Sequence, residues 1–202
     1  MRAGKMIFWD VDTQVDFMLP GGKLYVPGAE KIIPNLRLLV DAARQGRVLV
    51  LSSADAHTPE DEEFQQWPPH CLRGTPGQQK IPETLTQNFY VVPNQAGVVL
   101  PDNFQNYHQV LLEKQKIDVF TNPNIEAVLE RLGHEPEFVI FGVVTEYCVR
   151  CAALGLLDRG RRVAVVADAI QTLDPAVGKQ ALDELADRGG RLLTTNQALA
   201  LL

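Results

Sequence analysis

Short, largely apolar runs alternate along the chain with amphipathic segments of helical length. Apolar runs without a polar face are typical of strands that are buried on both sides of a parallel sheet. Strands are predicted at residues 5–11, 47–52, 109–113, 139–144, 162–169 and 191–195. About six strands separated by helices predict an α/β fold: an open, doubly wound parallel sheet with right-handed crossovers and helices on both faces.

Periodicity and end signals predict the intervening helices. They cover residues 29–45, 146–157 and 174–188, and a further helix begins near Asn122. Asn122 and Asp174 are each followed by proline, which combines a capping side chain with a residue suited to a first helical turn. Two short β-like pieces, residues 89–93 and 98–101, are expected at an edge of the sheet or in an excursion from it.

The composition is that of a globular protein with a small-molecule partner. The 202 residues are 46% hydrophobic and 22% charged, which argues against disorder and fits a single domain over residues 1–202. A net charge of −6 without a basic run argues against nucleic acid and anionic membranes as partners. No apolar stretch is long enough for a membrane-spanning helix. An odd number of cysteines, three, and no signal-peptide pattern predict a reducing, cytoplasmic location.

Cys148 follows the most apolar of the predicted strands and lies in the first turn of the next predicted helix. Unpaired backbone N–H groups and the helix dipole favour an anion there, so a nucleophilic thiolate is expected. Two other interpretations stay open at this point. A cysteine is often a small buried hydrophobe, and Cys148 with Cys151 forms a C-x-x-C pair, a redox signature.

Charged residues follow two other predicted strands. Asp10 and Asp12 lie at the end of residues 5–11, where alternation places them on the same side of the strand, and Lys114 follows residues 109–113. Ligands of open α/β sheets bind beyond the carboxyl ends of the strands, so Asp12, Lys114 and Cys148 can converge there. In such a set the cation favours the thiolate, the acid transfers the proton, and backbone N–H groups hold an oxyanion.

Residues 53–82 show little periodicity and form an unusually long connection, which is typical of a functional loop. The loop contains Asp55, His57, Glu63 and His70. Carboxylate and imidazole groups are ligands for divalent Zn, Fe or Mn, so a metal site is predicted. Trp67 precedes two prolines in a stiff segment, which presents an aromatic face or plugs the loop onto the core.

The chain resembles a known family in five stretches: DVDTQVDF, SADAH, WPPHCLRGTPG, EKQKIDVF and GVVTEYCV. They are similar to the isochorismatase-like cysteine hydrolases, and within them to the nicotinamidase/pyrazinamidase branch. The resemblance implies that Asp12 is the general acid/base, Lys114 the cation and Cys148 the nucleophile. It further implies a cis peptide bond between Val143 and Val144, with the N–H groups of Val144 and Cys148 as oxyanion hole.

The same resemblance implies a metal site and an aromatic clamp. Asp55, His57 and His70 match the family's metal ligands, with zinc expected and Fe or Mn as alternatives. Glu63 stands where many nicotinamidases carry a further His, and the neighbouring Glu60, Asp61 and Glu62 are alternatives to it. Phe17 and Trp67 match the aromatic residues that enclose the nicotinamide ring.

The function that the resemblance implies is hydrolysis of nicotinamide to nicotinate and ammonia, by a homo-oligomer. The segment after Lys114, QKIDVFTNPN, departs from nicotinamidases because it lacks their Gly/Tyr/Ser-rich run. A related cysteine amidase for another carboxamide or a ureido compound is therefore an alternative. A non-catalytic ligand-binding member of the family and a thiol-disulfide oxidoreductase are the others.

Overall fold

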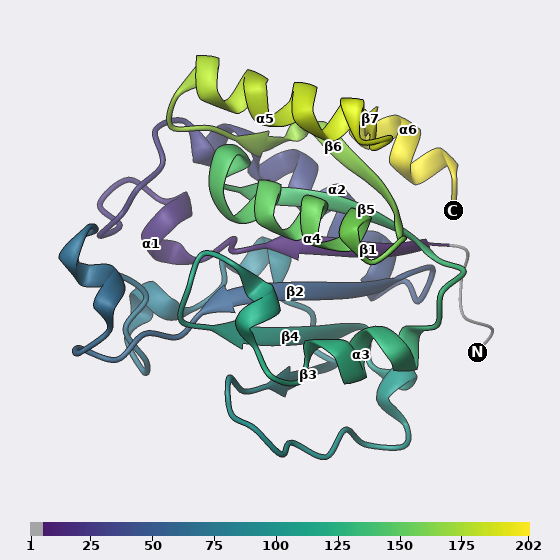
Figure 1. Cartoon of the computed structure of the whole chain (residues 1–202), viewed down its shortest axis with the longest axis horizontal. Coiled ribbons are helices and arrows are strands. Elements are labelled where there is room, and N and C mark those ends of the chain that lie inside the picture. Colours follow the sequence, from purple (N-terminus) through teal and green to yellow (C-terminus); the bar gives the residue numbers. More distant parts are fainter. Residues whose placement is uncertain (1–5) are drawn as a thin grey trace.

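The computed structural model describes residues 6–202, and its centre is one parallel sheet (Figure 1). The sheet has seven strands in the order β3-β4-β2-β1-β5-β6-β7. Their bounds are β1 Met6–Val11, β2 Leu49–Asp55, β3 Phe89–Val92, β4 Gln109–Lys114, β5 Glu137–Val143, β6 Arg162–Gln171 and β7 Arg191–Leu193. The order reverses beside β1, which is the switch point at which open α/β sheets bind their ligands.

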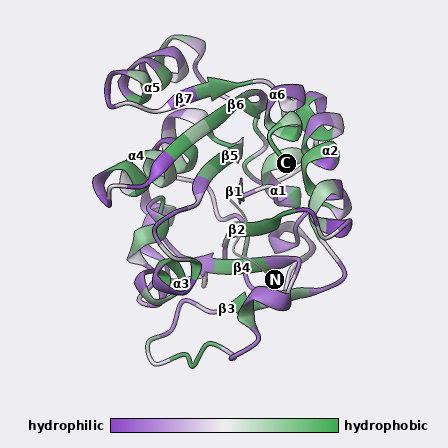
Figure 2. Cartoon of the chain, turned by 90° about the vertical axis from the view of Figure 1, so that its right-hand side faces the viewer, coloured by the Kyte–Doolittle hydropathy of each residue, from purple (hydrophilic) through white to green (hydrophobic). Residues whose placement is uncertain are grey.

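Helices cover both faces of this sheet (Figure 2). The α-helices are α1 Val15–Met18, α2 Ile33–Arg44, α3 Ile125–Leu132, α4 Arg150–Asp158, α5 Pro175–Asp187 and α6 Thr195–Ala200. In β1, Ile7 and Trp9 pack into the core below α3, α4 and α5, whereas Met6 and Phe8 pack into the core below α1, α2 and α6. Both faces of the strand are buried, which explains its continuous apolar run. The predicted doubly wound fold is confirmed.

The elements differ from the predicted ones in several places. The β-like piece predicted at residues 89–93 is confirmed as the edge strand Phe89–Val92. The piece predicted at residues 98–101 is wrong, because these residues form no strand. The segment before α4 is a π-helical turn, Thr145–Val149. A helix that was not predicted, α6, begins after Thr194, which forms a reciprocal capping box with Gln197. Residue 5, the predicted start of the first strand, lies outside the described residues.

The loop that follows β2 is folded around short 3-10 turns, Glu62–Gln65, Pro76–Gln78 and Pro82–Thr84. It lies beyond the carboxyl ends of the strands, at the left of Figure 1. A parallel bridge between His57 and Leu72 and an antiparallel bridge between Gln14 and Lys80 fix its two ends. None of the helices within residues 6–202 combines the length and the apolar character needed to cross a membrane.

Candidate active site and metal centre

Four adjacent strands deliver the predicted site residues to one edge of the sheet. Asp55 ends β2 and Lys114 ends β4, and the two residues are paired in the parallel register. Asp12 directly follows β1, and Cys148 lies in the π-helical turn after β5. Because β4, β2, β1 and β5 are neighbours in the sheet, side chains far apart in the sequence meet at this edge.

Gly142 permits the close approach of β5 to β1 at this edge. Its φ of +118° is unfavourable for other residues, and a Cβ placed there would lie 2.1 Å from the carbonyl oxygen of Val11. The chain then enters the cis peptide bond between Val143 and Val144, which the family resemblance implied and the structure contains. Cys148 lies in the first helical turn after β5, as predicted.

Lys114 connects the nucleophile to two acids. Its side chain is fully buried, with Nζ 2.9 Å from Asp12 Oδ2, 3.5 Å from Cys148 Sγ and in direct contact with Asp55 Oδ1. Burial alone would lower the pKa of Lys114, but Asp12 and Asp55 raise it well above its ordinary value. The ammonium group is therefore charged and shared between two carboxylates.

Burial and these neighbouring charges together shift the pKa of the Cys148 thiol. Burial raises the pKa of the Cys148 thiol well above its ordinary range, Lys114 lowers it, and the carboxylates of Asp12 and Asp55 raise it again. Among these four side chains the neutral thiol is favoured, contrary to the thiolate expected from the sequence. Burial likewise raises the pKa of Asp12, and Lys114 only partly offsets that effect.

Asp10 and Asp12 belong to different networks, which corrects the prediction that they share one side of the strand. Asp12 has a φ of +48° and leaves the extended conformation, and its Oδ1 accepts a 2.6 Å hydrogen bond from Ser53. Asp10 is still in β1, and its Oδ2 lies 2.8 Å from the buried Lys80 ammonium. Only Asp12 is therefore available to Cys148.

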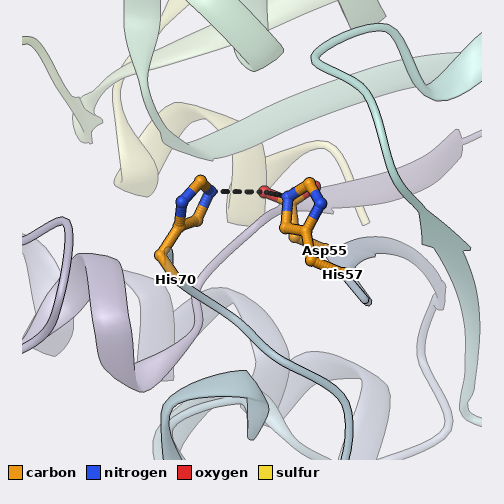
Figure 3. A group of neighbouring side chains, drawn as sticks. All are labelled: Asp55, His57 and His70. Atoms are coloured by element: carbon orange, nitrogen blue, oxygen red, sulfur yellow. Dashed lines mark ion pairs between the residues drawn. The ribbon is translucent and has the colours of Figure 1, made fainter. Parts of the chain in front are cut away.

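Asp55, His57 and His70 form a buried cluster whose candidate ligand atoms all lie within 4.8 Å of one another (Figure 3). Nε2 of His57 and Nε2 of His70 lie 3.8 and 3.7 Å from Asp55 Oδ2. Each imidazole donates its Nδ1–H elsewhere, His57 to Asp61 Oδ2 and His70 to the carbonyl of Pro68, both at 2.8 Å. In the neutral imidazoles this tautomer leaves the lone pair on Nε2, the atom that faces Asp55, as metal ligation requires.

The donor set fits a divalent metal ion. His57 Nε2 is buried without a hydrogen-bond partner, an arrangement that is costly unless another ligand satisfies it. Glu63 Oε1 lies 4.0 Å from His57 Nε2 and 3.8 Å from His70 Nε2, so this carboxylate faces the same point. Glu60 and Glu62 are exposed. One carboxylate, two imidazoles and a nearby second carboxylate suit Zn, Fe or Mn.

Two residues that sequence reasoning did not assign hold these ligands in place. Gln14 pairs its side-chain amide with the main chain of Asp55, accepting from its N–H at 2.7 Å and donating to its C=O at 2.8 Å. Asp16 accepts the N–H of Cys71 at 2.7 Å, next to the ligand His70. The stretch DVDTQVDF contains both residues, but no pattern in one sequence shows that they bind main-chain groups.

The predicted aromatic residues share a narrow apolar recess with the nucleophile. The recess measures about 40 Å³ and is lined by Phe17, Leu24, Val26, Trp67, Ile117, Val144, Tyr147, Cys148 and Leu173. Phe17 also packs against the ring of His70, with centroids 5.2 Å apart. Trp67 meets Tyr147 edge to face at 5.5 Å. The recess therefore adjoins both Cys148 and the histidine cluster.

A larger polar cavity of about 630 Å³ lies next to the recess, and Trp67 and Ile117 line both. Its charged lining is mostly acidic: Glu60, Asp61, Glu62, Glu63 and Asp118, against Lys116. The site thus combines an apolar inner recess with a mostly acidic outer cavity.

Cys151 gives no support to the redox alternative. Cys71, Cys148 and Cys151 are free cysteines. Burial raises the pKa of Cys151 above its ordinary value, whereas C-x-x-C oxidoreductases depend on a lowered thiol pKa.

The model of the isochorismatase domain matches residues 7–97 and 91–197. The chain belongs to the isochorismatase family. Among curated members, the nicotinamidase of Saccharomyces cerevisiae is 28% identical to this chain and covers 87% of it and 93% of its own length. The resemblance predicted from the sequence motifs is confirmed.

Solved structures of isochorismatase-like proteins have the same architecture. A pyrazinamidase of Pyrococcus horikoshii in complex with zinc has a TM-score of 0.76 at 28% identity, covering 95% of this chain and 99% of its own. An N-carbamoylsarcosine amidase of Thermoplasma acidophilum has a TM-score of 0.74 at 25% identity and covers 95% and 97%. Relatives of this fold thus include amidases with different substrates.

Proposed function

We propose that this isochorismatase-family hydrolase is a cysteine amidase that converts nicotinamide to nicotinate and ammonia. The observation that carries the proposal is the contact of one buried ammonium, Lys114, with both Asp12 and Cys148 beside an aromatic recess. An acid, a cation and a thiol in contact form the set that nucleophilic amide hydrolysis requires. The nicotinamidase and pyrazinamidase relatives favour an aromatic amide.

In the proposed mechanism, Cys148 Sγ attacks the amide carbonyl while its proton passes to the Asp12 carboxylate. This coupled transfer suits a thiol whose pKa is raised and an acid next to the same ammonium. The N–H groups of Val144 and Cys148 would stabilise the oxyanion. Collapse breaks the C–N bond, ammonia leaves with the proton from Asp12, and a thioester remains on Cys148. Water, deprotonated by Asp12, then hydrolyses the thioester to the carboxylic acid and the free thiol.

Asp55, His57 and His70, with Glu63, would hold the divalent metal. When bound, the ion supplies an electrophilic site that orients the substrate's ring nitrogen. The chain itself contributes the fixed donor geometry, because Gln14 holds the main chain of Asp55. Phe17 lines the recess and also packs against His70. The position of this metal ligand is therefore coupled to that of the substrate ring.

The charge of the two cavities favours a neutral amide over a carbamoyl amino acid. Among residues 6–202, no charged side chain lines the recess, and a substrate carboxylate there would lack a cationic partner. In the outer cavity Lys116 is exposed and lies 3.9 Å from Glu62, amid acidic neighbours. A carboxylate-bearing ureido compound, the class named for the Thermoplasma neighbour, would meet repulsion.

An ammonia assay over a matched panel tests the proposed function. The panel contains nicotinamide, pyrazinamide, benzamide, a short aliphatic amide and an N-carbamoyl amino acid. We expect the ring amides that carry a ring nitrogen to give the highest kcat/KM and the N-carbamoyl amino acid the lowest. Preference for the N-carbamoyl amino acid would refute the nicotinamide assignment while leaving the cysteine mechanism in place.

The aromatic clamp gives a second prediction. Trp67→Ala should raise KM for nicotinamide by roughly 2- to 12-fold more than for a small aliphatic amide, since aromatic contact contributes about 0.5 to 1.5 kcal/mol beyond area. Steady-state kinetics on both substrates measure the difference. Equal effects on the two would show that Trp67 only closes the loop onto the core.

The hydrogen bond from Ser53 to Asp12 gives a pH prediction. It lowers the pKa of Asp12, because a donor stabilises the charged carboxylate. Ser53→Ala should therefore raise that pKa and move the acidic limb of kcat/KM to higher pH, by roughly 0.5 to 1 unit for a bond worth about 1 kcal/mol.

Ser52→Ala is the matched control for this profile. Ser52 is the neighbouring buried serine, but it donates to Asp10 at 3.2 Å and not to Asp12. The acidic limb of kcat/KM for Ser52→Ala should coincide with that of the unmodified chain. A Ser53→Ala profile that also coincides with it would show that another group controls the acidic limb.

A further inference from the structure

The Asp61 carboxylate accepts hydrogen bonds from three residues, His57, Thr58 and Gln115. His57 Nδ1 and the N–H of Thr58 donate to Oδ2 at 2.8 and 3.2 Å. The hydroxyl of Thr58 donates to Oδ1 at 2.8 Å. Gln115 Nε2 lies 3.1 Å from both carboxylate oxygens. The carboxylate is thus fixed in orientation while it fixes the ring of His57.

The same network extends to residues that follow β4 and the edge strand β3. Gln115 follows Lys114 directly, and its Oε1 accepts a 3.0 Å hydrogen bond from Asn94 Nδ2. Consecutive residues thus serve the two halves of the site: Lys114 contacts Cys148, and Gln115 holds Asp61.

The adjacent acid shows that position, and not charge alone, distinguishes Asp61. The Asp61 side chain is 14% exposed, whereas that of Glu62 is 86% exposed and pairs only weakly, at 3.9 Å, with Lys116. Both belong to the acidic run Glu60 to Glu63. Removing either changes the local charge by the same amount, but only Asp61 contacts a candidate ligand.

We propose that Asp61, held by Gln115 and Thr58, is a positioning residue that keeps His57 in the tautomer and ring orientation required for metal binding. A carboxylate that accepts Nδ1–H leaves Nε2 unprotonated and makes it a better electron-pair donor. This inference rests on the metal site in the proposed function. It assigns Asp61 a role as partner of His57, where the sequence left it as an alternative ligand.

The test is metal affinity measured on apo-protein, with no substrate present. Zn²⁺ is titrated in competition with a chromophoric chelator, and the visible absorption of Co²⁺ reports the geometry of the ligand set. Asp61→Ala should weaken Zn²⁺ binding 10- to 100-fold, the usual effect of removing such a partner, and alter the Co²⁺ spectrum. Asp61→Asn should weaken Zn²⁺ binding less than Asp61→Ala. The main-chain N–H of Thr58 still needs an acceptor, which turns the remaining side-chain oxygen toward it, and at this position the oxygen also accepts from His57 Nδ1.

Glu62→Ala and Glu62→Gln are the controls of matched charge, and both should bind Zn²⁺ within about threefold of the unmodified chain. Gln115→Ala, which leaves the Asp61 carboxylate in place, should give a smaller loss than Asp61→Ala. Thermal unfolding of the apo-proteins separates these effects from misfolding. Equal affinities for the Asp61 and Glu62 variants would overturn the inference and leave the proposed function standing. Failure of the unmodified chain to bind Zn²⁺ or Co²⁺ would remove both the metal role and the inference.

Discussion

Replacing Cys148 with alanine is expected to lower kcat/KM for nicotinamide by on the order of 10⁴-fold or more, since removal of a covalent nucleophile leaves only binding and oxyanion stabilisation. Cys148 is the sulfur in contact with Lys114, at 3.5 Å. The variant should keep its fold, because the side chain lies at the edge of the recess and is only partly buried. Ammonia release measures the loss, and mass spectrometry of the unmodified chain, quenched during turnover, should show an acyl group on Cys148.

Cys151→Ala provides the matched control within the same C-x-x-C pair. It removes the other thiol of the pair and should retain activity within a few-fold, because the proposed chemistry does not use it. Loss of hydrolysis in both variants, together with dithiol-disulfide exchange by the unmodified chain, would favour the redox alternative. Near-normal hydrolysis by Cys148→Ala would refute the covalent mechanism itself.

The strands that carry the site could be predicted from the sequence because a strand buried on both faces is a continuous apolar run. β1, β2, β4 and β5 were all recognised in this way, and with them the residues at their carboxyl ends. The pattern of residues 89–93 fits both an edge strand and an excursion from the sheet, because Phe89, the first residue of β3, is 39% exposed and lacks that apolar environment. The short helix α1 was missed because four residues, Val15–Met18, are too few for helical periodicity.

The balance of charge within the site could not be predicted from residue types. Proximity of Lys114 to Cys148 suggested a thiolate, but the register also pairs Lys114 with Asp55, which the ligand pattern assigned to the metal alone. Burial raises the pKa of Cys148, and the carboxylates of Asp12 and Asp55 raise it further against the effect of Lys114. Similarly, alternation placed Asp12 with Asp10, and only the positive φ of Asp12 separates them.

The dual contact of Asp55 links the metal site to the nucleophile. Its Oδ1 contacts Lys114, and its Oδ2 lies 3.8 Å from His57 Nε2 and 3.7 Å from His70 Nε2. Burial alone would raise the pKa of Asp55, but Lys114 lowers it, and the pKa of Asp55 lies below its ordinary value. One carboxylate therefore takes part in both halves of the site, and whatever neutralises its charge changes the field at Cys148.

Removal of the metal is consequently expected to impair both turnover and the reactivity of Cys148. A chelator, or His70→Ala, should lower nicotinamide hydrolysis by about 10²-fold or more, since a bound ion contributes several kcal/mol of positioning and charge stabilisation. Alkylation of Cys148 at fixed pH should also slow, by roughly tenfold for a rise of about one unit in its pKa. The sign follows from charge: without a cation on Asp55, two carboxylates oppose a single Lys114, which raises the pKa and lowers the thiolate fraction.

Metal content, turnover and alkylation rate are measured on the same samples, with alkylated peptides identified by mass spectrometry so that Cys148 is distinguished from Cys151. His134→Ala is the control, because His134 is exposed and belongs to no cluster of candidate ligands among residues 6–202; all three quantities should stay unchanged. Full turnover in metal-free protein would refute the metal role. Lost turnover with unchanged alkylation would show that the ion acts on the substrate alone and that Asp55 does not transmit its charge to the nucleophile.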